Sequence, residues 1–142
     1  MNAVRAAQWR LLTELAAGAA VSTGAGVAAW RAGRRIDSAF LKSFGRQTLV
    51  WAAVDAGVVA VGVSRRGPAP ADPESARALA RRMRLVTGAN AVADVGYAAG
   101  GVALARRWPA RRGDGLAVVV QSLFLLWLNA RHARGFHAMA RR

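Results

Sequence analysis

The sequence of 142 residues has no cysteine and few acidic side chains. Without cysteine, disulfides, cysteine zinc sites and thiol nucleophiles are excluded. Aspartate and glutamate number 7 against 21 lysines and arginines, so the formal net charge is +14. Hydrophobic residues nevertheless make up 54% of the chain, which is too apolar for a disordered basic tail. Charge and apolarity must therefore occupy different segments of the chain.

The sequence also lacks the common motifs of catalytic sites. It contains no glycine-rich phosphate loop, nucleophile elbow, HExxH motif or acidic metal cluster. The two histidines, His132 and His137, lie among arginines, without the further donors that a haem or metal site needs. We therefore expect neither an enzyme nor a bound cofactor or metal.

Four stretches of the chain are almost free of charge. Each is long enough, or nearly so, to cross a hydrocarbon core of ~30 Å as a helix that rises ~1.5 Å per residue. The basic residues lie almost entirely between them. We predict an all-α fold, a four-span transmembrane helical bundle with short connectors that forms one membrane domain over residues 1–142. The predicted spans are residues 11–30, 47–64, 85–105 and 115–130.

The first span is the least hydrophobic, because it consists mostly of alanine and glycine. Trp9 and Trp30 bracket it at a separation that suits two interfacial anchors. A cleavable signal peptide is the alternative for this segment. Against it, Glu14 interrupts the apolar run and no clear cleavage site follows.

A soluble four-helix bundle is the alternative for the whole chain. Such a bundle needs a solvated polar face on every helix. In the fourth stretch, the only strongly polar side chains before Asn129 are the neighbours Gln121 and Ser122. A helix that is apolar nearly all round favours burial in a membrane.

The first connector has an amphipathic pattern. In residues 34–45, Ile36, Phe40 and Phe44 recur at every fourth position, and basic side chains occupy much of the remaining surface. Such a segment can lie along the headgroup boundary with its basic side on anionic lipid. We predict one interfacial amphipathic helix here.

The second connector, residues 65–73, is rich in proline and predicts an exposed loop. Asp72 is expected to be the N-cap of the next helix and Pro73 its first residue. The last connector is a short polar turn. The side of the bundle that carries both termini and the second connector has 12 lysines and arginines against 9 on the other side, so both termini are predicted to be cytoplasmic.

The second and third spans contain an internal repeat. Sliding the chain by 39 residues aligns residues 48–63 with residues 87–102 and gives seven identities in sixteen positions. The identities include Asp55 with Asp94 and Thr48 with Thr87. Because consecutive spans cross the membrane in opposite directions, the repeat implies a pseudo-two-fold axis in the membrane plane.

The repeated aspartates are the strongest candidates for a functional site. Both lie near the middle of their spans, where a charged aspartate costs ~2.5 to 3.5 kcal/mol, so they are expected to face each other or the bundle interior. Ionising two neighbouring carboxyls that are both removed from water costs a large free energy, so we expect at least one carboxyl to be protonated at neutral pH. The predicted intramembrane polar cluster consists of Asp55, Asp94, Asn90, Tyr97 and Gln121.

Two further features have both a packing and a functional interpretation. Glu14 lies one turn inside the first span, where it could form a structural ion pair with Arg10 or reach the membrane interface. Gly18, Ser22 and Gly26 recur at every fourth position and form a ridge of small residues that lets another helix approach closely. The ridge could pack inside the bundle or form a homodimer.

Three of the predicted spans carry motifs that together support a resemblance. The motif residues are Trp51 in the second span, Asn90, Asp94, Gly96, Tyr97 and Gly100 in the third span, and Gln121, Phe124, Leu125 and Leu126 in the fourth. With these motifs the sequence resembles an uncharacterised family of small bacterial four-helix integral membrane proteins of unknown function. The resemblance implies a bacterial cytoplasmic (inner) membrane location but no reaction, and this chain has Asn129 where such proteins tend to have an acid.

Two functions remain open from the sequence. The first is a structural or accessory membrane protein whose polar pairs fix the bundle. The alternative is a small proton- or cation-coupled transporter that uses Asp55 and Asp94. A dry, packed interface beside the carboxyls would favour the first, and a pocket beside them would favour the second. The expected partners are the lipid bilayer and anionic headgroups at the arginine-rich connectors, with no nucleic acid, because the arginines are scattered.

Overall fold

A computed structural model of the chain describes residues 3–141. These residues form four α-helices and one short 3-10 helix, and no strand occurs among them. The prediction of an all-α fold is confirmed. The elements are α1 (Ala3–Arg35), α2 (Ala39–Ser64), α3 (Pro73–Arg107), η1 (Pro109–Arg111) and α4 (Arg112–Ala140).

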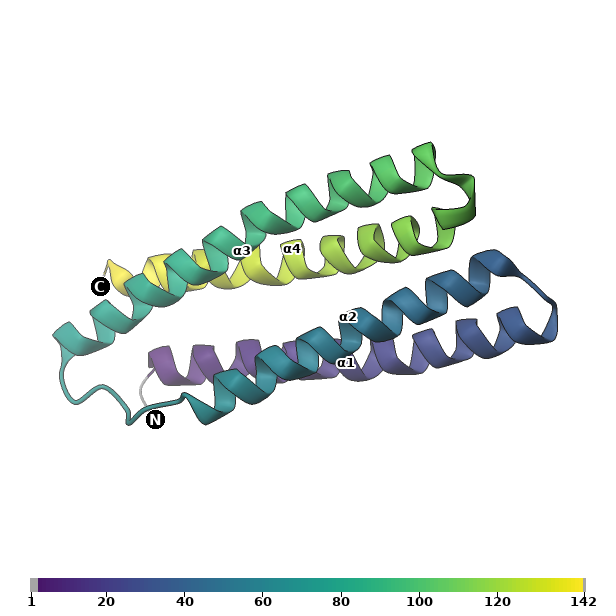
Figure 1. The fold of residues 1–142 in the computed structure, drawn as a ribbon. Helices are drawn as coiled ribbons and strands as arrows, with labels where there is room; N and C mark the ends of the chain where they lie inside the picture. The colour runs from purple at the N-terminus through teal and green to yellow at the C-terminus, as the bar shows by residue number, and fades with distance from the viewer. Residues whose placement is uncertain (1–2, 142) are drawn as a thin grey trace.

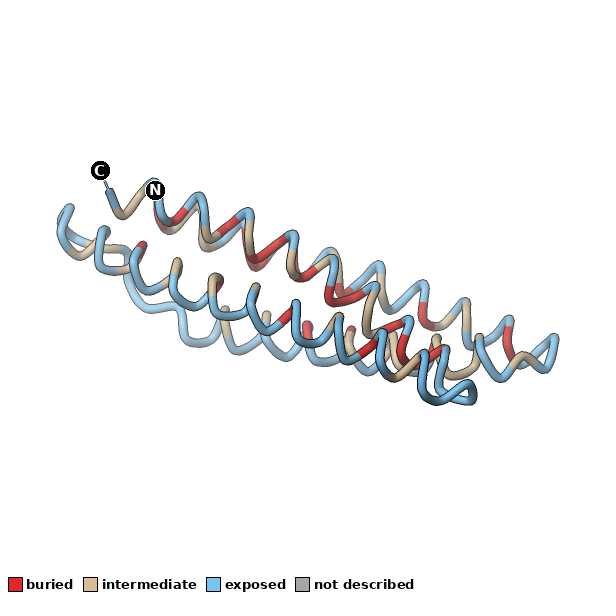
Figure 2. Tube along the Cα trace, turned by 90° about the horizontal axis from the view of Figure 1, so that it is seen from above, coloured by how far each residue is buried: buried red, intermediate tan, exposed pale blue. Residues whose placement is uncertain are grey.

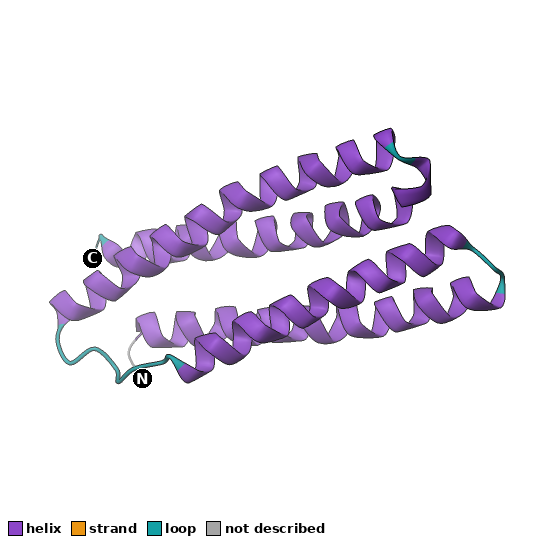
Figure 3. Ribbon diagram, viewed as in Figure 1, coloured by secondary structure: helices purple, strands orange, loops and turns teal. Residues whose placement is uncertain are grey.

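The helices form two antiparallel hairpins, α1 with α2 and α3 with α4, which lie side by side (Figure 1). Both termini and the loop between α2 and α3 lie at one end of the bundle, and the two short turns lie at the other (Figures 1 and 3). α4 contacts α1, α2 and α3. The backbones of α2 and α3, by contrast, stay more than 8 Å apart at every pair of α-carbons in the described chain.

Three of the helical segments are long and apolar enough to cross a membrane, namely Ala3–Arg35, Ala39–Ser64 and Pro109–Ala140. α3 is not among them. It carries Asn90 and Asp94 within its apolar part, and its first turns are charged. Length and composition therefore support three of the four predicted spans.

The prediction of one interfacial helix over residues 34–45 is wrong. α1 runs on to Arg35, the chain then turns, and α2 begins at Ala39. Asp37 has a positive φ of 52°, in the left-handed region that ends a helix. Ser38 is the N-cap of α2 and accepts a hydrogen bond of 3.3 Å from the backbone N–H of Leu41. The amphipathic pattern is thus divided between the ends of two long helices.

The second connector is built as predicted. Asp72 is the N-cap of α3, Pro73 is its first residue, and Asp72 and Ser75 form a reciprocal capping box. The backbone N–H of Ser75 holds the pKa of the Asp72 carboxyl below its ordinary value. The cap therefore stays ionised at neutral pH and weakens only as the pH falls through that lowered pKa.

The apolar core is concentrated toward the end of the bundle that carries the termini. Here Phe136 of α4 and Ala80 of α3 are fully buried, so the charged first turns of α3 continue to pack on α4. Figure 2 shows that most of the remaining surface of the helices is exposed. The buried residues of the core cluster are Val4, Leu11, Leu15, Ala80, Leu125, Leu128 and Phe136.

The opposite half of the bundle is held by close backbone approach. A Cβ on Gly45 of α2 would lie 2.5 Å from the backbone nitrogen of Trp30 and 2.6 Å from the carbonyl oxygen of Gly26, both in α1. A Cβ on Gly101 of α3 would lie 2.8 Å from the carbonyl oxygen of Gly115 in α4. Each hairpin therefore requires glycine at its contact, as small-residue packing between helices does in membranes.

The predicted ridge of small residues packs inside the bundle. A Cβ on Gly18 would meet the ring of Phe124 in α4, and Gly26 is buried against α2. The Ser22 hydroxyl donates a hydrogen bond of 3.3 Å to the side-chain oxygen of Gln121 in α4. Packing within one chain, the first of the two predicted uses, accounts for all three residues, and a homodimer through this face would have to compete with these contacts.

We predict that Gly45→Ala lowers the free energy of unfolding by roughly 1–3 kcal/mol, because the new methyl group meets backbone atoms that cannot move aside. The matched control is Gly57→Ala in the same helix, where nothing lies within 4 Å of the new methyl group. It should leave stability unchanged or raise it by up to about 1 kcal/mol through helix propensity. Unfolding in detergent measures both, and equal effects would contradict the close approach of α1 and α2.

Candidate functional site

Asp55 of α2 is buried and is tied to α4. The Nε2 amide of Gln121 donates a hydrogen bond of 2.5 Å to Oδ2 of Asp55. The oxygen of the same amide accepts the hydrogen bond from Ser22 in α1. Gln121 therefore links three helices through one side chain, and its predicted role as a partner of the buried acids is confirmed for Asp55.

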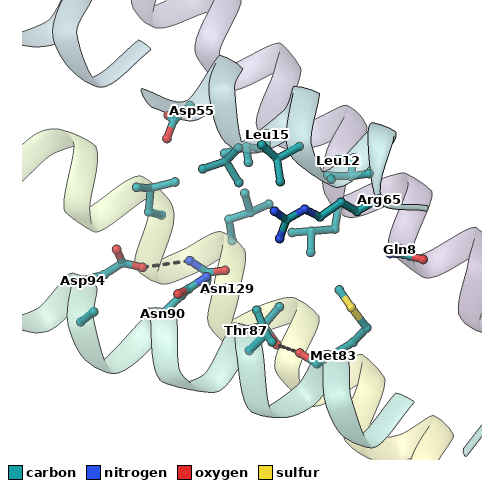
Figure 4. A pocket seen from close by; sticks show the side chains of 18 of the residues that line it. Gln8, Leu12, Leu15, Asp55, Arg65, Met83, Thr87, Asn90, Asp94 and Asn129 are labelled. Atoms are coloured by element: carbon teal, nitrogen blue, oxygen red, sulfur yellow. Dashed lines mark hydrogen bonds between the residues drawn. The ribbon is translucent and has the colours of Figure 1, made fainter. Parts of the chain in front are cut away.

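Asp94 of α3 is buried and is tied to α4 in the same way. The Nδ2 amide of Asn129 donates a hydrogen bond of 3.0 Å to Oδ2 of Asp94 (Figure 4). The sequence did not include Asn129 in the predicted cluster. The sequence could have suggested Asn129, because it lies eight residues after Gln121, just over two turns further along α4 and about 80° around the helix, so both amides can face the bundle interior.

The internal repeat corresponds to similar local structure in α2 and α3. Each repeated aspartate accepts a hydrogen bond from an amide side chain of α4. Each repeated threonine, Thr48 and Thr87, donates a hydrogen bond of 2.8 Å to the backbone carbonyl four residues earlier in its helix. α2 and α3 run in opposite directions (Figure 1), so the two copies of the repeat are antiparallel.

Both carboxyls line a pocket of about 800 Å³ that is bordered by all four helices. Asp55 and Asp94 lie on opposite walls of this pocket (Figure 4). No hydrogen bond joins them within residues 3–141. The two acids thus share a cavity, and each is bonded to its own amide.

The remaining members of the predicted cluster lie at the edge of this pocket. Asn90 and Tyr97 line it but are exposed, and neither is hydrogen-bonded to a carboxyl in the described chain. The Tyr97 ring makes an edge contact with the ring of Trp51, with centroids 5.5 Å apart. The indole nitrogen of Trp51 is buried and has no hydrogen-bond partner among the described residues. Trp51, which also lines the pocket, thus has a buried donor that is not hydrogen-bonded.

Glu14 forms an ion pair, but not with Arg10, which was one of its two predicted possibilities. Glu14 instead faces α4, where it forms an ion pair with Arg131 and lies 2.9 Å from Nε2 of His132. Because α1 packs on α4, the carboxylate finds these groups in place of the neighbour on its own helix. His132 is buried and engaged by this contact. Between residues 3 and 141, no group of three or more histidine, aspartate and glutamate side chains could hold a metal ion.

A second interhelical ion pair was not predicted. Arg46 of α2 contacts the buried carboxylate of Asp114 in α4 at 3.2 Å. The pair lies at the turn end of the bundle, away from the pocket. The sequence does not indicate this pair, because Arg46 and Asp114 lie in different predicted connectors. Only the packing of α2 on α4 brings them together.

Residues 14–130 match the model of a family of unknown function (DUF6992). The chain belongs to this family. The matched residues include both carboxyl–amide pairs, so the resemblance to an uncharacterised family is confirmed. Membership in DUF6992 assigns no reaction or ligand. No curated protein and no solved structure matched the chain.

We predict that Gln121→Leu destabilises the bundle by about 1–3 kcal/mol, because it leaves the buried Asp55 carboxyl without its donor. Replacing both partners by leucine should cost less than the sum of the two single changes, since the unsatisfied group is then absent. Val120→Leu, at the exposed neighbouring position, is the control and should be nearly neutral. Unfolding in detergent provides the double-mutant cycle, and strictly additive effects would exclude a direct pair.

Proposed function

We propose that the chain is a small four-span protein of the bacterial cytoplasmic membrane, a non-enzymatic accessory component that binds a ligand from the bilayer in its pocket. The observation that carries the proposal is the pocket itself, which lies beside two buried carboxyls and between helices whose backbones do not meet. The carboxyl–amide pairs serve as the frame of this pocket. Both termini lie on the cytoplasmic side in this proposal.

The exposed surface supports burial in a membrane. Only 11% of the most apolar window of α2 is buried inside the protein, so most of this hydrophobic surface needs an apolar surrounding. Large side chains such as Val92, Leu123 and Trp127 are exposed on α3 and α4 as well. A water-soluble bundle would present polar residues at these positions.

The environment of Asp94 supports α3 as the fourth span. An aspartate lowers the hydropathy of the helix, but this one is buried and hydrogen-bonded, so its cost in a bilayer is reduced. The charged first turns of α3 lie at the end of the bundle with the termini, where Arg84 contacts His137. They would extend into the cytoplasm, and the apolar part from Leu85 onward would cross the membrane.

The one-sided shape of the pocket favours binding over conduction. The pocket reaches from the carboxyls to the end that carries the termini, where Arg5, Arg65 and Gly67 border it. Beyond the carboxyls, the glycine contacts at Gly45 and Gly101 bring the backbones within each hairpin together. The residues that line the pocket thus extend no further toward the turn end than Trp51 and Tyr97, and a ligand can occupy the half of the bundle that carries the termini.

The alternative is a small proton- or cation-coupled transporter. It is favoured by the presence of both carboxyls in one pocket. Transport would require the glycine-packed half to open. The amide partners favour the accessory role, because they satisfy the acids without a transported ion.

The topology has a direct test, because the chain has no native cysteine. We expect Ile36→Cys and Ala110→Cys to react with a membrane-impermeant maleimide in intact cells, because both lie at the turn end of the bundle. Ala69→Cys, in the loop at the opposite end, should react only after permeabilisation. If Ala69 and Ala110 label from the same side, α3 does not span. If the protein is released by alkaline washing, it is not integral.

The role of the carboxyls is tested by Asp55→Asn and Asp94→Asn. Asparagine keeps the size and hydrogen-bonding capacity of aspartate, so both variants should fold with unchanged proton and cation flux in liposomes. Asp55→Leu, which keeps no polar group, is the control and should destabilise by about 1–3 kcal/mol because Gln121 loses its acceptor. Measurable flux in the native protein that disappears in the asparagine variants would instead establish the transporter.

A further inference from the structure

The pocket has two chemically different ends. Asp55 and Asp94 lie at the inner end, and Arg5, Arg65 and Arg82 lie at the end near the termini. Asp55 precedes Arg65 by ten residues on and just beyond α2, which corresponds to about 15 Å at the rise of a helix. This length is close to half of a ~30 Å hydrocarbon core. The pocket therefore has the depth of one lipid leaflet.

The arginines at the outer end carry positive charge that the protein does not neutralise. Arg5 is fixed in place by the side chain of Gln8 and by the carbonyl groups of Gly67 and Pro68, which are uncharged. The side chains of Arg65 and Arg82 have no hydrogen-bond or ion-pair partner in the part of the chain that is described. Figure 4 shows the Arg65 side chain extending into the pocket.

The walls between the two ends are apolar and face each other across the gap between α2 and α3. Val54, Val58 and Val61 occur at helical spacing on α2, and Leu79, Met83 and Val86 occur at the same spacing on α3. The three valines of α2 and Val86 are each about half exposed. No backbone of the described chain closes this gap. An apolar chain can thus enter from the side.

We propose that the pocket binds one anionic phospholipid, with its phosphate at Arg65 and Arg82 and an acyl chain between the apolar stripes of α2 and α3. This inference rests on the proposed function, because it requires the arginines to lie at a membrane surface. Guanidinium groups bind phosphate with paired charge-assisted hydrogen bonds, and the valine walls bind the chain. The carboxyls at the inner end repel an anion, so the headgroup can bind in one orientation only.

The test uses delipidated full-length protein in mild detergent, titrated with dioleoyl-phosphatidylglycerol while the midpoint of thermal unfolding is recorded. Ligands that bind the folded state raise this midpoint with concentration. We expect phosphatidylglycerol to raise it and dioleoyl-phosphatidylcholine to have a much smaller effect. Inorganic phosphate and dihexanoyl-phosphatidylglycerol, which lack long chains, should have little effect. A phosphate effect equal to that of the lipid would overturn the proposal in favour of a free-anion site.

The charge requirement is tested by the double variant Arg65→Gln/Arg82→Gln. Its apparent affinity for phosphatidylglycerol should fall roughly tenfold or more, as expected for the loss of charge-assisted hydrogen bonds. The matched control is Arg81→Gln/Arg134→Gln, which removes the same charge at the same end of the bundle from residues that do not line the pocket. Equal losses in both double variants would mean a non-specific charge effect and overturn the site.

The need for an acyl chain in the pocket is tested by Val58→Trp, which places a large side chain on the apolar wall and leaves every charge in place. Val50→Trp is the control, because Val50 is on the same helix and is 51% exposed like Val58, but does not line the pocket. We expect lipid affinity to fall only in Val58→Trp, and equal affinity in both variants would overturn the proposal.

The arginine variants and the valine variants are independent, so one set still decides if the other fails to fold. Failed topology labelling would refute the membrane protein itself, whereas correct labelling without lipid discrimination refutes only this lipid site.

Discussion

The hydrogen bonds from two amides of α4 to the carboxyls of α2 and α3 are the constraint on which the rest of the structure depends. A buried carboxyl without a partner is costly, and this cost increases in an apolar surrounding. Because Gln121 and Asn129 both lie on α4, α2 and α3 are each hydrogen-bonded to α4, and they contact each other through the rings of Trp51 and Tyr97 while their backbones stay apart. The space between α2 and α3 therefore remains open, and the pocket occupies it.

The two halves of the bundle are stabilised by different means. At the end with the termini, large side chains such as Phe136 and Leu128 fill the interior. At the turn end, glycines let the two backbones of each hairpin approach so closely that a Cβ atom at Gly45 or Gly101 would clash with the other helix. The pocket lies in the half filled by side chains, because helices separated by large residues leave room that glycine contacts do not. The pocket therefore extends from the carboxyls toward the end of the bundle that carries the termini.

The charged side chains that line the pocket are divided between its two ends, and this division connects the fold to the proposed function. Arg65 and Arg82 border the pocket without a charged partner in the described structure, while Asp55 and Asp94 occupy its other end. A ligand that matches the arginines and the apolar walls must carry an anion at one end and an apolar portion beyond it. Amphiphiles of the bilayer have this arrangement, and water-soluble anions do not. The ligand class that fits this pocket is therefore an anionic amphiphile of the bilayer.

The sequence by itself determined the local features of this protein. The four helices, the Asp72 cap and the polar face with Asp94 follow from spacing and residue type, which act within a few turns of one helix. Only the tertiary structure decided that Asn129 pairs with Asp94, that Glu14 faces Arg131 and that the chain turns at Asp37. Helices rich in alanine and glycine can pack at many rotations, so their own patterns do not specify which faces meet. The pocket exists only because one set of rotations places both carboxyls against α4.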